Sequence, residues 1–157
     1  MQRPILPNSV QLPFLISADM KQAESQEDDV SIEGMRILLA EDNELNMEIA
    51  EFLLTNAGAE IIRASNGKEA VEAFAKSGVG EVNVILMDIM MPVMDGLEAT
   101  REIRTMNRSD ASAVVIIAMT ANAFAEDKSK ALKAGMDDYL TKPLESEKLI
   151  RALSRFL

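Results

Sequence analysis

Short apolar runs that alternate with helical patterns are the feature that most limits the fold of this chain. The runs at 36–42, 60–64, 82–88, 113–120 and 138–141 have the length and content of strands. Amphipathic or capped segments follow them at 47–56, 66–78, 95–106, 125–134 and 146–157. Because each strand is followed by a helix, the pattern predicts a parallel sheet with helices on both faces and right-handed crossovers.

The expected topology follows from this alternation. We predict an α/β fold, namely a flavodoxin-like, doubly wound parallel sheet of five strands in the order 2-1-3-4-5 with five helices. The half-polar run at 60–64 suits an edge strand. Asn66 and Glu69 have the spacing of a capping box at the start of one helix. In the helix at 47–56, the pattern places Ile49, Phe52 and Leu53 on one apolar face.

Polar side chains stand where the apolar runs end. Asp88 ends the third run, and Glu41 and Asp42 end the first. Thr120 ends the fourth run, and Lys142 follows the fifth. Parallel sheets bind ligands at the edge where their strands end, and the predicted order makes the first and third strands neighbours. Each acid alone is more typical of a helix cap or a solvated loop, but three together indicate a site for a hard cation.

The composition excludes several functions. A formal net charge of -10 argues against nucleic-acid binding, which requires clustered Lys and Arg. The chain has no Cys, which rules out a disulfide scaffold and suits a cytoplasmic location. It has no His, so neither a phosphohistidine nor a histidine base lies within it. The apolar segments are far shorter than a membrane span, and we expect no membrane contact.

The first residues differ from the rest. Three of the five prolines lie before residue 14, and an acidic run follows at 24–29. Such a segment has little to bury. We therefore expect a flexible leader or linker at 1–34 and one folded domain at 35–157.

Four motifs stand in a fixed order after residue 35. They are Glu41-Asp42-Asn43, the run from Met87-Asp88 to Met91-Pro92-Val93-Met94-Asp95-Gly96, Met119-Thr120-Ala121 and Thr141-Lys142-Pro143. In this order and spacing they resemble the receiver domain of two-component signalling, which is the phosphoacceptor module of response regulators and hybrid histidine kinases. The wording of the motifs is most similar to the receivers of hybrid sensor histidine kinases.

The resemblance implies a role for each of these residues. Asp88 is the expected phosphoacceptor, with Lys142 and Thr120 binding phosphoryl oxygens and Ala121 leaving room beside them. Mg²⁺, with Mn²⁺ as an alternative, is the expected cofactor. Its ligands would be Glu41, Asp42, Asp88 and the backbone carbonyl of Met90.

The resemblance also implies how a signal leaves the site. Thr120 and Tyr139 are the expected switch pair: Thr120 moves toward the phosphoryl group and vacates space into which the Tyr139 ring rotates. The helix at 125–134, the fifth strand and the last helix would form the output surface. The peptide bond before Pro143 is expected to be cis.

The leading expectation is a receiver that takes a phosphoryl group from a phosphohistidine and signals or passes the group on through its surface. It would catalyse only its own phosphorylation and dephosphorylation. The expected partners are a histidine kinase, a histidine phosphotransfer protein or both, and a monomer is expected. The main alternative is a receiver-like interaction module that works without phosphorylation.

Two further alternatives fit less well. A phosphatase of the haloacid dehalogenase type needs a second Asp two residues after its nucleophile, where Met90 stands. A flavodoxin needs a phosphate-binding loop after its first strand, and the sequence has none there. Between a stand-alone regulator and the receiver of a larger hybrid kinase, the wording of the motifs and the unusual first residues favour the second.

Overall fold

The computed structural model describes residues 31–121 and 125–156. In these residues five strands form one parallel sheet: β1 (Arg36–Ala40), β2 (Glu60–Ala64), β3 (Val84–Asp88), β4 (Val115–Thr120) and β5 (Asp138–Thr141). Their order across the sheet is β2-β1-β3-β4-β5. The predicted fold class and strand order are therefore confirmed. Three strands begin or end up to two residues inside the predicted runs.

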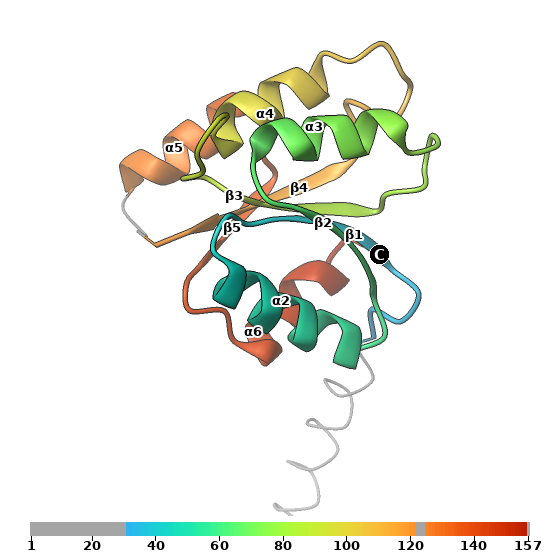
Figure 1. The fold of residues 1–157 in the computed structure, drawn as a ribbon, viewed down its shortest axis with the longest axis vertical. Helices are drawn as coiled ribbons and strands as arrows, with labels where there is room; N and C mark the ends of the chain where they lie inside the picture. The colour runs from blue at the N-terminus through green and yellow to red at the C-terminus, as the bar shows by residue number, and fades with distance from the viewer. Residues whose placement is uncertain (1–30, 122–124, 157) are drawn as a thin grey trace, which may run out of the picture. The chain divides into compact units, whose positions relative to one another are not determined.

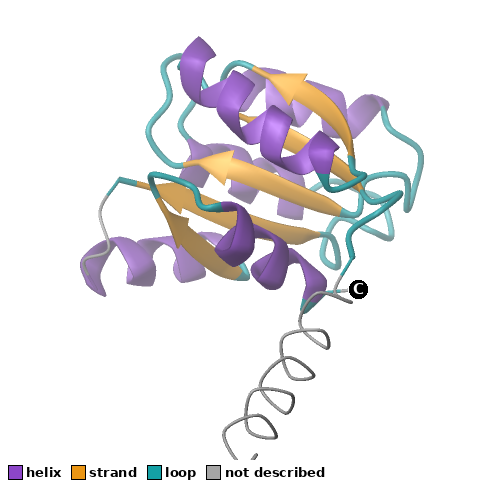
Figure 2. Cartoon of the chain, turned by 90° about the horizontal axis from the view of Figure 1, so that it is seen from below, coloured by secondary structure: helices purple, strands orange, loops and turns teal. Residues whose placement is uncertain are grey.

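The five helices of the described residues cover both faces of the sheet. They are α2 (Glu44–Asn56), α3 (Gly67–Lys76), α4 (Gly96–Arg104), α5 (Ala125–Ala134) and α6 (Ser146–Ser154). Figure 1 shows α3, α4 and α5 on one face and α2 and α6 on the other, and Figure 2 shows the same layers from below. The side chains of Asn43, Asn66 and Asp95 cap α2, α3 and α4 by accepting hydrogen bonds from backbone amides.

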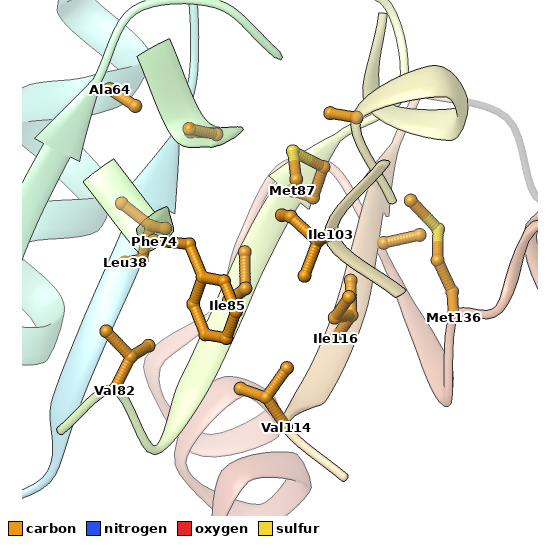
Figure 3. Close-up of a cluster of buried hydrophobic side chains, with 14 of the residues drawn as sticks. Leu38, Ala64, Phe74, Val82, Ile85, Met87, Ile103, Val114, Ile116 and Met136 are labelled. Atoms are coloured by element: carbon orange, nitrogen blue, oxygen red, sulfur yellow. The ribbon is translucent and has the colours of Figure 1, made fainter. Parts of the chain in front are cut away.

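Two hydrophobic clusters hold these layers together. The first lies under α3, α4 and α5, and Figure 3 shows Phe74 and Ile103 of these helices among the strand residues Leu38, Ile85 and Ile116. The second cluster lies under α2 and α6. All residues of β3 are buried because both of its faces are covered. Burial of a side chain as large as Phe74 contributes about 2–3 kcal/mol.

The packed face of α2 differs from the predicted one. Met47, Ala50 and Leu54 are buried against the sheet, whereas Ile49 and Phe52 are 46% and 67% exposed. The helix has two apolar stripes, and periodicity alone does not say which of them packs. Ala50 lets the helix backbone lie close to the sheet, which favours the stripe that contains it. The prediction for Ile49 and Phe52 was wrong in this respect.

The folded unit begins at Ile32, whose side chain is buried in the second cluster. This residue lies within the range 1–34 that we predicted as a leader or linker, most of which is outside the described residues. In the described part of the chain, no helix combines the length and the apolar character needed to cross a bilayer.

Candidate functional site

An acidic pocket lies where β1 and β3 end. The two strands pair in parallel with Ala40 opposite Met87, so Glu41 and Asp42 follow one strand beside Asp88 of the other. Carboxylate oxygens of the three acids lie within 4.8 Å of one another. Glu41 and Asp88 are buried, with 3% and 5% of their surface exposed, and Asp42 is exposed. The cluster predicted from the sequence is therefore present.

Lys142 bridges the two buried acids. Its Nζ donates hydrogen bonds to Glu41 Oε1 at 2.6 Å and to Asp88 Oδ2 at 2.9 Å. Burial of the ammonium acts to lower the pKa of Lys142, but the hydrogen bonds and the charges of Glu41 and Asp88 outweigh it and raise this pKa above its ordinary value. Lys142 therefore remains a cation at neutral pH. The four side chains of the pocket together carry a formal charge of about -2.

Backbone amides fix the other oxygen of each buried acid. Glu41 Oε2 accepts a hydrogen bond from the Asn43 amide at 3.1 Å, and Asp88 Oδ1 accepts one from the Met90 amide at 3.2 Å. Both carboxylates are thus held from two sides, while Asp42 faces a surface hollow that Met90 also lines. Three carboxylates with one open side are the kind of donor set that suits Mg²⁺, which takes one or two carboxylates and keeps several waters.

Two glycines hold the loop between β3 and α4. The Gly96 amide donates to the Ile89 carbonyl at 2.9 Å, and a Cβ on Gly96 would overlap the carbonyl oxygen of Asp88. The Gly67 amide donates to the Met94 carbonyl at 2.9 Å, so the start of α3 holds the far part of the same loop. Val93 in this loop has a φ of 71°, a left-handed conformation that is rare for a β-branched residue. The loop that carries Met90 is therefore tightly constrained.

The remaining predicted residues lie at or just after the ends of β4 and β5, the strands that follow β3 across the sheet. Thr120 is 7% exposed at the end of β4, pairs with Thr141 of β5, and accepts a hydrogen bond from the Lys142 amide at 2.8 Å through its carbonyl. Ala121 is exposed directly after it. The peptide bond between Lys142 and Pro143 is cis, as the resemblance implies. The neighbouring strand ends thus bring Thr120 and Lys142 to the same edge as Asp88.

The sequence predicted Tyr139 in the fifth strand but did not indicate the residue that contacts its ring. The half-buried ring packs against the first hydrophobic cluster, and the Nζ of Lys128 lies 4.5 Å from the ring centroid. Lys128 belongs to α5, and nothing in the spacing of a single sequence connects it with a residue of β5.

An exposed apolar stripe was also missed. Leu45, Ile49 and Phe52 of α2 are 67%, 46% and 67% exposed, and we call these three residues the α2 strip. Ile49 also lines a small hollow with Glu41 and Lys142, so one end of the strip reaches the acidic pocket. The spacing of the three residues, four and then three, was the available signal, but the sequence indicated a packed face rather than an exposed one.

The fold and the pocket together define a class: a doubly wound α/β protein with a cluster of three acids at the ends of two neighbouring strands. Residues 37–154 match the response regulator receiver domain. The chain belongs to this family.

Known relatives agree with this assignment. The chain is 40% identical over 121 residues to hybrid signal transduction histidine kinase I of Dictyostelium discoideum, a match that covers 76% of this chain but only 7% of that kinase. A second similar protein is the receiver domain of sensor histidine kinase PA1611 from Pseudomonas aeruginosa PAO1, whose crystal structure has a magnesium ion coordinated in the active site cleft. It is 41% identical, with a TM-score of 0.71 over 78% of this chain and 97% of that one.

A third relative was crystallised with a partner. It is the receiver domain of the response regulator Ssk1 of Saccharomyces cerevisiae, in complex with the histidine phosphotransfer signaling protein Ypd1. This chain is 31% identical to that receiver domain, with a TM-score of 0.70, over 79% of this chain and 89% of that one.

Proposed function

We propose that this chain is a phosphoacceptor that takes a phosphoryl group from a phosphohistidine onto Asp88 in a magnesium-dependent reaction. The observation that carries the proposal is the setting of Asp88: a buried carboxylate at a strand end, with two further acids within 4.8 Å and the Lys142 ammonium at 2.9 Å. Packing three carboxylates together costs free energy. A purely structural role of Asp88 would therefore not favour this arrangement.

The side chains suggest how the transfer proceeds. An Asp88 carboxylate oxygen attacks phosphorus and forms an O–P bond, while the electron pair of the breaking N–P bond stays with the donor imidazole, which takes up a proton. Lys142 is within reach of a phosphoryl oxygen bound to Asp88 and supplies a positive charge there. The hydroxyl of Thr120, at the adjacent strand end, would donate to a second oxygen.

The acidic pocket supports a divalent cation as cofactor. Glu41, Asp42, Asp88 and the Met90 carbonyl would hold Mg²⁺, and Mn²⁺ suits the same oxygen ligands. When bound, the cation neutralises charge on the transferring phosphoryl oxygens. The magnesium ion of the PA1611 receiver supports this assignment.

The phosphodonor would be a histidine kinase or a histidine phosphotransfer protein. This sequence contains no His, so the phosphohistidine has to come from elsewhere. The Ssk1 receiver in complex with Ypd1 supports a partner of this class. The α2 strip offers an apolar contact surface next to the pocket, which such a partner would cover. We place the reaction in the cytoplasm, with the domain acting as a monomer.

Intact mass after incubation with acetyl phosphate and Mg²⁺ tests the proposal. The wild-type chain should gain about 80 daltons, as one covalent phosphoryl group requires, and Asp88→Asn should gain nothing. Asp127→Asn, which neutralises a half-buried acid on α5, is the matched control and should be labelled like the wild type. Equal labelling of Asp88→Asn at the same site contradicts the assignment.

A different outcome would favour the alternative function. If the wild-type chain gained no mass but still bound a phosphotransfer protein through the α2 strip, the chain would be an interaction module that works without phosphorylation. Phe52→Ser removes apolar surface from the α2 strip, and binding through the strip should weaken in this variant. Because Phe52 is exposed, its loss should leave the fold intact.

A further inference from the structure

The contact between Lys128 and Tyr139 joins α5 to the strand next to the active site. We propose that Lys128 is a positioning residue that holds the Tyr139 ring in its observed orientation and thereby opposes the change that phosphorylation of Asp88 drives. This inference rests on the proposed function and on the movement of Thr120 and Tyr139 that the resemblance to receivers implies after phosphorylation.

The sheet register places the three side chains on one face. Ala118 is a member of the first hydrophobic cluster, and Thr120, two residues further along β4, points to the same face because side chains alternate along a strand. Tyr139 is paired with Ala118 on the neighbouring strand and packs against the same cluster. The α5 helix covers this face and supplies Lys128, whose Nζ lies 4.5 Å from the ring centroid.

The contact has the geometry of a cation–π interaction. An ammonium within about 6 Å of a ring centroid is attracted by the negative face of the ring. Lys128 and Tyr139 are both half-buried, so water screens the attraction only in part. For such a pair the attraction favours the observed ring orientation by about two- to fivefold over an orientation that loses the contact.

The direction of the effect follows from linkage. If the ring has to leave Lys128 when Thr120 moves toward the phosphoryl group, Lys128 stabilises the unswitched form. By reciprocity, removing the ammonium should then strengthen the binding of a phosphoryl mimic at Asp88 by the same factor. Lys128 touches neither Asp88 nor its ligands in this account. It acts only through the Tyr139 ring.

The composition of the chain supplies a direct probe. Tyr139 is the single Tyr, and there is no Trp, so tyrosine fluorescence reports on this ring alone. Titration with beryllofluoride in the presence of Mg²⁺ should change this fluorescence in the wild-type chain. The midpoint of the change measures the affinity for the mimic.

Three variants test the role of Lys128. Lys128→Met should bind beryllofluoride about two- to fivefold more tightly than the wild type. Lys128→Arg keeps a cation over the ring and should restore wild-type affinity. Lys130→Met removes the same charge from an exposed position of α5 and is the matched control, with wild-type affinity expected. If Lys128→Met bound the mimic no more tightly than Lys130→Met, the inference would be wrong.

A double-mutant cycle separates the ring from long-range charge. In a Tyr139→Leu background, Lys128→Met should no longer change the affinity for beryllofluoride, as followed by the amide NMR signal of Thr120. A persisting effect would mean that the charge of Lys128 acts by another route, which overturns the inference. Failure of the wild-type chain to bind the mimic or to gain a phosphoryl group would remove the proposed function and the inference with it. Failure of the Lys128 variants alone removes only the inference.

Discussion

At the edge of the sheet where the strands begin, two arginines are surrounded by acceptors. Arg104 and Arg108 have side chains that are only 15% and 13% exposed. Arg104 donates to the carbonyls of Ala111, Val114 and Gly135 and pairs with Asp137 at 2.9 Å. Arg108 donates to the carbonyls of Phe74, Ser77 and Gly78, pairs with Asp110, and lies over the Phe74 ring at 4.2 Å. Each cation there has its own carboxylate.

At the opposite edge, where the strands end, the charges do not balance. Among the residues that the structure describes, three carboxylates of the acidic pocket share the single ammonium of Lys142. The comparison separates two uses of partly buried charge. The arginine edge is complete in itself and stabilises the fold, whereas the acidic edge carries an excess of negative charge that a bound cation would have to offset. Removing a guanidinium from the arginine edge should therefore destabilise the fold, whereas removing a carboxylate charge from the acidic edge should stabilise it.

The largest effect is expected at the arginine edge. Arg104→Met keeps much of the side-chain volume but leaves three carbonyl groups and Asp137 without their donor, which should lower the free energy of unfolding by about 2–4 kcal/mol. Urea denaturation measures this change. Arg101→Met, at an exposed position of the same helix, is the control and should change stability by less than about 0.5 kcal/mol. Equal effects of the two variants would show that the arginine edge is not structural.

The opposite sign is expected in the acidic pocket. Asp42→Asn removes one of three like charges, and in EDTA it should raise the free energy of unfolding by about 1 kcal/mol. This gain should exceed the loss of the favourable interaction between the Asp42 charge and the N-terminus of α2. The same variant should lose most of the stabilisation that Mg²⁺ gives the wild type. Asp127→Asn is again the control, and a destabilised Asp42→Asn in EDTA would contradict the comparison.

A smaller effect concerns acid pH at the arginine edge. The hydrogen bond from Arg108 lowers the pKa of Asp110 from 3.8 to about 2, with a further contribution from the Gly80 amide. Because the folded pKa lies below the unfolded one, this carboxylate stabilises the fold above about pH 4, and its contribution is lost as the pH falls toward 2. The difference in unfolding free energy between wild type and Asp110→Asn should therefore shrink over this range. A constant difference in urea midpoints from pH 5 to 2 would exclude the linkage.

The two edges also differ in how far the sequence predicted them. The acidic pocket could be predicted because each of its residues stands at the end of an apolar run, and parallel strands bring such ends together. The contacts of Arg104 and Arg108 could not, since their acceptors are mostly backbone carbonyls of loops and of the last turn of α3, up to 34 residues away. Carbonyls are present at every position and leave no mark in a sequence. The packed face of α2 was misjudged for a related reason, because burial depends on which stripe the sheet meets.

The cap of α2 has a further consequence. Asn43 directly follows Asp42, its amide donates to Glu41, and its side chain accepts a hydrogen bond from the Asn46 amide inside the helix. No linker separates the pocket from the helix that displays Leu45, so the two share one rigid frame. A partner protein that binds the α2 strip is therefore oriented toward Asp88 as well as held close to it. Loosening the cap would therefore disturb the orientation of a bound partner before it weakened its binding. The rate of phosphoryl transfer to Asp88 would fall, while the binding constant of the partner would stay unchanged.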